Sequence, residues 1–142
     1  MSELTTVFLT VFSGVLTYVA GQLVLKSLIE PVQELKRTVG MVSFTLIERG
    51  KVIYNPGNSA KDIMDDTARE LRKLASHLRA HLSLIPCYDI SARIFGLPRR
   101  VHIDNAMRNL IGVSNGIHDD PQRKNGDLVE KICKSLAIPQ PD

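Results

Sequence analysis

The feature that most constrains this chain is a long stretch without charged side chains. It runs from Leu4 to Leu25 and contains 22 residues. As an α-helix it would be about 33 Å long, at about 1.5 Å per residue. The hydrocarbon core of a bilayer is about 30 Å thick. The stretch therefore predicts a transmembrane helix.

Two other interpretations of this stretch are less favoured. A cleavable signal peptide has a basic segment before its apolar region and small residues before the cleavage site. The first residues here, Met-Ser-Glu-Leu, are not basic, and cleavage after Ala20 would leave the bulky Tyr18 near the cut. A buried helix of a soluble protein is the third interpretation, but in a chain of 142 residues such a helix is seldom apolar for so long.

The basic residues predict the orientation of the span. All 18 Lys and Arg residues lie in 26–142, where 14 of the 15 acidic residues also lie, for a net charge of +4. Lys26, Lys36 and Arg37 follow the span closely. By the positive-inside rule the N-terminus lies outside and residues 26–142 lie in the cytoplasm, which places the protein in a cell inner membrane.

One face of the predicted span carries small residues. Ser13, Thr17 and Gly21 are spaced by four, and Gly14 lies beside them. Such faces let two transmembrane helices approach closely, so this face is expected to support self-association. In the alternative interpretation the hydroxyls bond only their own backbone and the glycines are merely tolerated.

After the span, Pro31 predicts a kink or a restart of the helix. Apolar residues then recur over 32–46 at spacings of three and four, which predicts a helix. Its stripe would form an intermolecular coiled coil or pack against later helices of the same chain. The segment 41–47 could instead be a strand, because it is rich in β-forming residues.

The remainder of the chain is expected to be helical. Periodicity and turn residues predict helices at 60–84, 88–95, 101–115 and 126–136, with loops at 50–59 and 118–126. The predicted fold is all-α: one N-terminal transmembrane helix followed by a small cytoplasmic bundle of four to five helices. The expected divisions are an anchor at 1–30 that spans the membrane at about 4–25, a helical domain at 31–138 and a C-terminal tail at 139–142.

No motif for catalysis or for a cofactor occurs in the sequence. His77 and His81 share one helical face and could hold a metal, but Leu78 stands where the zincin motif requires Glu. Cys87 and Cys133 lie in no paired-cysteine motif, and we expect both to be reduced in the cytoplasm. We therefore predict neither a cofactor nor a metal, with these histidines as weak candidates only.

Arg99 and Arg100 precede the helix expected at 101–115. The positive end of the helix dipole disfavours cations there, whereas two arginines and free backbone N–H groups could together bind an anion. A nucleotide or a lipid headgroup would suit such a site. In the simpler interpretation both side chains are solvated or pair with Asp104 or with acidic helix faces.

Two segments carry a resemblance. The segments FLTVFSGVLTYVAGQLVLKSLIEPVQELKRTVG and FGLPRR…AMRNLIGVSNGI resemble uncharacterised bacterial single-pass membrane proteins with a cytoplasmic helical domain. The resemblance implies an inner-membrane setting, bacterial or phage-related. It implies no catalytic residues.

These observations predict a non-enzymatic single-pass membrane protein. Its expected partners are the lipid bilayer and either a second copy or another membrane or cytoplasmic protein. The first alternative is a membrane sensor-effector that binds a phosphate-containing ligand at Arg99 and Arg100. The second is a membrane-bound metal enzyme or hydrolase built on His77, His81 and Cys87. The absence of Trp and the few other aromatic residues argue against a nucleic-acid partner.

Overall fold

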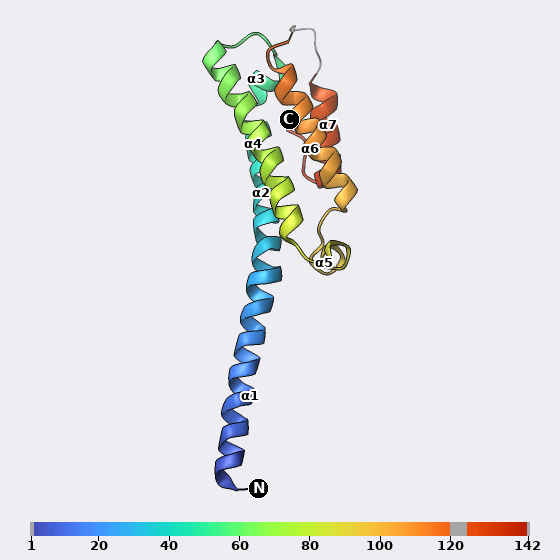
Figure 1. The fold of residues 1–142 in the computed structure, drawn as a ribbon. Coiled ribbons are helices and arrows are strands. Elements are labelled where there is room, and N and C mark those ends of the chain that lie inside the picture. Colours follow the sequence, from blue (N-terminus) through green and yellow to red (C-terminus); the bar gives the residue numbers. More distant parts are fainter. Residues whose placement is uncertain (1, 120–124, 142) are drawn as a thin grey trace.

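Helices are the only regular elements in the residues described by the computed structural model, which are 2–119 and 125–141. The predicted linker at 118–126 and the predicted tail therefore lie partly outside the described residues. Figure 1 shows one long helix whose C-terminal half joins a bundle. The elements are α1 (Glu3–Val24), the π-helical turn η1 (Leu25–Ile29), α2 (Glu30–Glu48), α3 (Gly50–Tyr54), α4 (Lys61–Leu84), α5 (Tyr88–Phe95), α6 (Arg100–Gly116) and α7 (Gly126–Leu136). The all-α prediction is confirmed for these residues.

The elements α1, η1 and α2 form one continuous helix of 46 residues, Glu3–Glu48. The prediction of a kink or restart at Pro31 is corrected to a π-helical turn just before it. The Glu30 N–H bonds to the Leu25 carbonyl oxygen, five residues earlier. Pro31 has no N–H to donate, and it directly follows this wider turn as the second residue of α2. The helix therefore passes Pro31 without ending (Figure 1).

The apolar stripe of α2 packs within the chain. Val32, Leu35, Val42 and Leu46 are buried, and α2 packs against α4. The stripe is therefore not free to form an intermolecular coiled coil. The strand alternative for 41–47 is wrong, because the same residues continue α2 and its buried members face this core.

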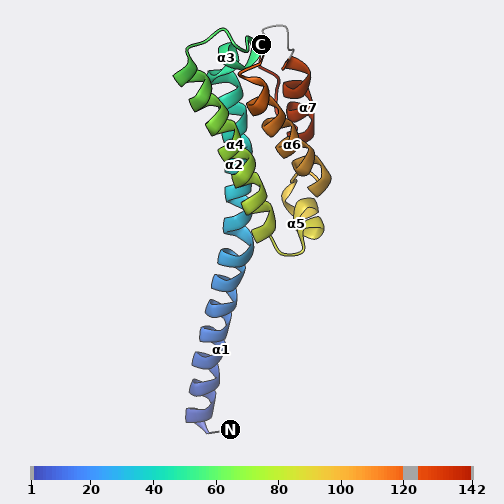
Figure 2. The ribbon, with the colours of Figure 1, turned by 45° about the horizontal axis from the view of Figure 1, so that its top comes forward.

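The bundle consists of α2, α4, α6 and α7, with α4 and α6 at its centre. The apolar faces of α4, α6 and α7 are buried, apart from Leu128, which is partly buried, and Ile63, which is 44% exposed. Ile63 lies in the first turn of α4, at the free end of the bundle (Figure 2). The Ser114 hydroxyl joins α6 to α4 by donating to the Ala68 carbonyl oxygen at 2.8 Å.

Two local predictions near the free end are corrected. The loop predicted at 50–59 begins with the short helix α3, and α4 begins at Lys61, one residue after the predicted start. Asn125 does not cap α7 with its side chain. Its amide instead donates to the Ile53 carbonyl oxygen at 3.0 Å and so ties α7 to α3.

The end of α7 gives a test of this local geometry. Ala137 follows α7 with φ of 54°, a left-handed conformation that favours glycine, and the Ile138 N–H bonds back to Cys133. We expect Ala137→Gly to raise the free energy of unfolding by about 0.5–1 kcal/mol, because it removes the strain at the Cβ atom.

Ala80 is the matched control, because it is exposed in the last third of α4. Ala80→Gly is expected to lower the same free energy by about 1 kcal/mol. Urea denaturation followed by circular dichroism measures both variants. A loss of stability in Ala137→Gly would contradict the described end of α7.

Candidate functional site

Within the described residues, the small-residue face of α1 does not pack against any other element. Ser13, Gly14, Thr17 and Gly21 are all exposed, and no residue of α1 is buried. A Cβ atom built at Gly14 or Gly21 would meet nothing within 4 Å. The Thr17 hydroxyl donates to the Ser13 carbonyl oxygen at 2.9 Å, as the alternative interpretation expected. Within the described residues, no close packing contact therefore requires a glycine at position 14 or 21.

A second apolar face lies on the outer side of α2. Met41, Phe44 and Ile47 are 43%, 56% and 62% exposed, and a Cβ atom at Gly40 would also meet nothing within 4 Å. Sequence analysis missed these residues, because the stripe at spacings of three and four accounted for the helix by itself. The sequence feature that could have indicated this outer face is a second set of apolar residues in 41–47, which lie off that stripe.

The π-helical turn sets how these two faces lie around the helix. Successive residues of an α-helix are about 100° apart, and a π-helical turn holds about one residue more than an α-helical turn. With that extra residue, Gly21 and Gly40 lie at nearly the same angle around the axis. Gly21 then lies about 140° from Leu35 in the core, at about 100° per helical step. We call Gly14, Gly21, Gly40, Phe44 and Ile47 the outer face of the long helix.

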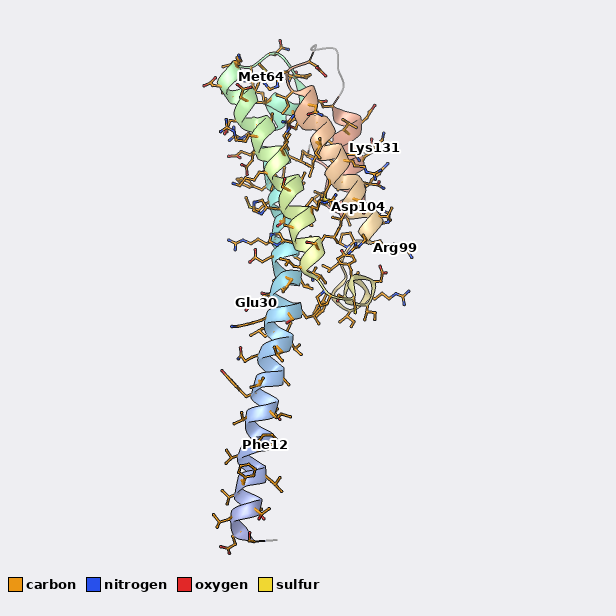
Figure 3. The ribbon with its side chains drawn as sticks, in the orientation of Figure 1. Phe12, Glu30, Met64, Arg99, Asp104 and Lys131 are labelled. Atoms are coloured by element: carbon orange, nitrogen blue, oxygen red, sulfur yellow. The ribbon has the colours of Figure 1, made fainter. Side chains whose placement is uncertain are left out.

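Arg99 and Arg100 lie where α6 begins, at the end of the bundle nearest the anchor (Figure 3). Both are exposed, and together with Arg93 and Asp89 they line an open hollow. Asp104 lines a different hollow, beside Arg79 and Arg108. Within the described part of the chain, no carboxylate forms an ion pair with Arg99 or Arg100, so the pairing with Asp104 that the simpler interpretation offered does not occur.

Tyr88 lies against Arg100, one of the residues that line this hollow. It is buried, its hydroxyl donates to the Pro98 carbonyl oxygen at 2.7 Å, and the Arg100 guanidinium lies 5.8 Å from its ring centroid. Burial raises the pKa of Tyr88 to about 12, against the opposing charge of Arg100. The phenol therefore stays neutral and holds the α5–α6 connection in place.

The metal candidates form a pair without further ligands. The rings of His77 and His81 stack with centroids 5.8 Å apart in the groove between α2 and α4. Among the described residues, no group of three or more His, Cys, Asp or Glu side chains could hold a metal ion. The Nε2 atom of His118 lies 2.6 Å from Oδ1 of Asp65 on α4, and this contact joins residues 53 apart in sequence.

The comparisons with known proteins give no relative from which a role could be carried over. No protein-family model, no curated protein and no solved structure matches the chain. The exposed faces of the long helix carry the glycines and apolar residues for which the fold gives no reason.

The two free cysteines give a test of the domain. Cys87 is exposed, whereas Cys133 is buried in the core, and burial raises the pKa of its thiol. Because thiolates are the reactive form, a maleimide at neutral pH is expected to label Cys87 rapidly and Cys133 only after denaturation. Mass spectrometry of labelled peptides measures this, with Cys87→Ser as the control. Rapid labelling of Cys133 in the folded Cys87→Ser variant would contradict the described core.

Proposed function

We propose that this chain is a single-pass membrane protein that self-associates through the outer face of its long helix and thereby pairs its helical domains. Supporting the anchor, α1 has 22 residues and an apolar character that would let it cross a membrane by length and composition. None of its most apolar window is buried inside the protein. It is therefore not a core helix of this chain, and lipid is the environment that would stabilise it.

Three glycines of the outer face support this dimer most directly. Glycine inside a helix costs about 1 kcal/mol relative to alanine. Gly14, Gly21 and Gly40 incur that cost although, among the described residues, a Cβ atom added at any of the three would meet nothing within 4 Å. A second helix lying close against the outer face would use the space at all three positions.

The exposed side chains of α2 extend the same face beyond the membrane. Phe44 and Ile47 are more than half exposed and lie at nearly the angle of Gly21 around the helix. In water, apolar side chains favour burial against another apolar surface. In a parallel pair of copies, the outer faces would meet along both α1 and α2. The proposed assembly is therefore a parallel homodimer.

The proposed compartment is a cell inner membrane, with the bundle in the cytoplasm. The support is the absence of basic residues before Lys26 and the cluster of basic residues after it. The proposed role is non-enzymatic: the anchor confines the pairing of the helical domains to the membrane surface.

Bulky substitutions on the outer face test the dimer. In Gly14→Ile and Gly21→Ile the added side chains would separate the helices, so we expect dimerisation in lipid vesicles to weaken by roughly tenfold or more. Förster transfer between donor- and acceptor-labelled full-length chains, diluted with lipid, measures the dimer.

Val19→Phe is the matched control, because Val19 lies two residues before Gly21 and so on the opposite side of α1. It is expected to leave the transfer unchanged. Phe44→Ser tests whether the face continues along α2 and is expected to weaken the dimer less than the glycine variants. Transfer that persists in both glycine variants would overturn self-association through this face.

The native cysteine tests the orientation. In intact spheroplasts a membrane-impermeant maleimide is expected to spare Cys87 and to label Ser2→Cys in a Cys87→Ser chain. Permeabilising the membrane should expose Cys87 to the reagent. The reverse pattern would place the bundle outside and overturn the proposed orientation.

A further inference from the structure

The end of the bundle nearest the anchor has the arrangement of a membrane-binding surface. It comprises the end of α4, the whole of α5 and the start of α6. In Figure 1, α5 lies at this end and is viewed nearly along its axis, whereas α1 runs along the picture. The helix α5 therefore lies across the direction of the anchor, which is the direction of a membrane plane if α1 spans the membrane.

The distance of α5 from the end of the apolar stretch matches the thickness of a lipid headgroup layer. Lys26 and Ser27 line one hollow together with Leu84 and Pro86, so the end of α4 lies beside the first turn after α1. Figure 3 places α5 at the level of Glu30. Glu30 is about 7 Å beyond Leu25 along the helix, at about 1.5 Å per residue. Each headgroup layer of a bilayer is roughly 5–8 Å thick.

Large apolar side chains are exposed at this end. Ile90 and Ile94 lie one turn apart on the outer side of α5 and are 62% and 69% exposed, and Leu84 is 61% exposed. On the inner side of the same short helix, Ser91 and Ala92 are buried against the bundle. The packing of α5 on the bundle therefore does not use the two isoleucine side chains.

The charges of this end fit an anionic surface. Arg93 lies on α5 between Ile90 and Ile94, and Arg99 and Arg100 follow nearby, all three exposed. Asp89 is the one acidic residue of α5. Within the described ranges none of the three arginines forms an ion pair. Basic side chains next to exposed apolar ones are typical of helices that lie in the interface of an anionic bilayer.

We propose that Leu84, Ile90, Arg93, Ile94, Arg99 and Arg100 form a membrane-docking surface that binds the headgroup layer of an anionic bilayer. The apolar side chains insert beside the acyl chains, and the arginines bind lipid phosphates. This inference depends on α1 spanning the membrane but not on dimerisation. It gives the domain a second attachment besides the anchor and holds the bundle against the membrane surface.

The absence of native Trp allows a direct depth measurement on the full-length chain. Ile94→Trp is the reporter on the docking surface. Ile63→Trp is the matched control, because Ile63 is also exposed but lies at the opposite end of the bundle. Phe12→Trp reports on the anchor. Each variant is reconstituted in vesicles of phosphatidylglycerol and brominated phosphatidylcholine, whose bromine atoms quench Trp fluorescence in the acyl region.

We expect strong quenching in Phe12→Trp, clear quenching with a blue-shifted emission in Ile94→Trp, and no quenching in the Ile63→Trp control. Quenching in Phe12→Trp without quenching in Ile94→Trp would overturn the docking surface and leave the anchor intact. A blue shift in Ile94→Trp without quenching would also overturn it, in favour of a protein partner. No quenching in Phe12→Trp would refute the transmembrane anchor itself.

The arginines provide the second measurement. In the Ile94→Trp chain, Arg93→Gln with Arg99→Gln is expected to lower the ratio of docked to undocked domain by roughly tenfold or more. Replacing phosphatidylglycerol with phosphatidylcholine should act in the same direction. Lys61→Gln with Arg69→Gln is the control, since it removes the same charge from the half of α4 that lies away from the docking surface. Quenching that responds to neither the arginines nor the anionic lipid would overturn the assignment to an anionic surface.

Discussion

A single helix runs from α1 through the π-helical turn into α2, and this continuity determines how the bundle is attached to the N-terminal half. Because the helix does not end at Pro31, the same rigid element forms the apolar N-terminal half and one wall of the bundle. The π-helical turn makes this continuity compatible with a proline that cannot donate a hydrogen bond. The direction of α1 relative to the bundle is therefore set by a helix rather than by a loop.

The bundle gives α2 two different sides. Its inner side packs on α4 through residues such as Leu35 and Val42, which are fully buried. Its outer side carries Phe44 and Ile47, for which the described part of the chain offers no covering element. The first side stabilises the fold, so the second is the one available for a partner.

Much of the helical architecture could be predicted from the sequence. Apolar residues at spacings of three and four marked the buried faces of α2, α4 and α6, and the long uncharged stretch marked α1. Such patterns are local, and burial of one face follows directly from them. The glycines of α1 and the two arginines at the start of α6 were also identified locally, from residue type and position.

Other features depend on contacts that the sequence does not reveal. The pair of His118 and Asp65 joins residues 53 apart, and the Asn125 amide reaches Ile53 across 72 residues. The outer residues of α2 were hidden by the stronger stripe on the same helix. The level of α5 beside the end of the anchor follows from how α4 and α6 pack, so neighbouring residues in sequence could not indicate it.

The π-helical turn also decides whether two copies could pair without colliding. If the helix were α-helical throughout, Gly21 would lie about 40° from Leu35, on the side where α4 packs. If two such helices packed together at their glycines, their bundles would lie on the same side and clash. The added residue increases the angle between the glycines and the bundle to about 140°. A partner helix could then pack on one side of the long helix while the bundle occupies the other side.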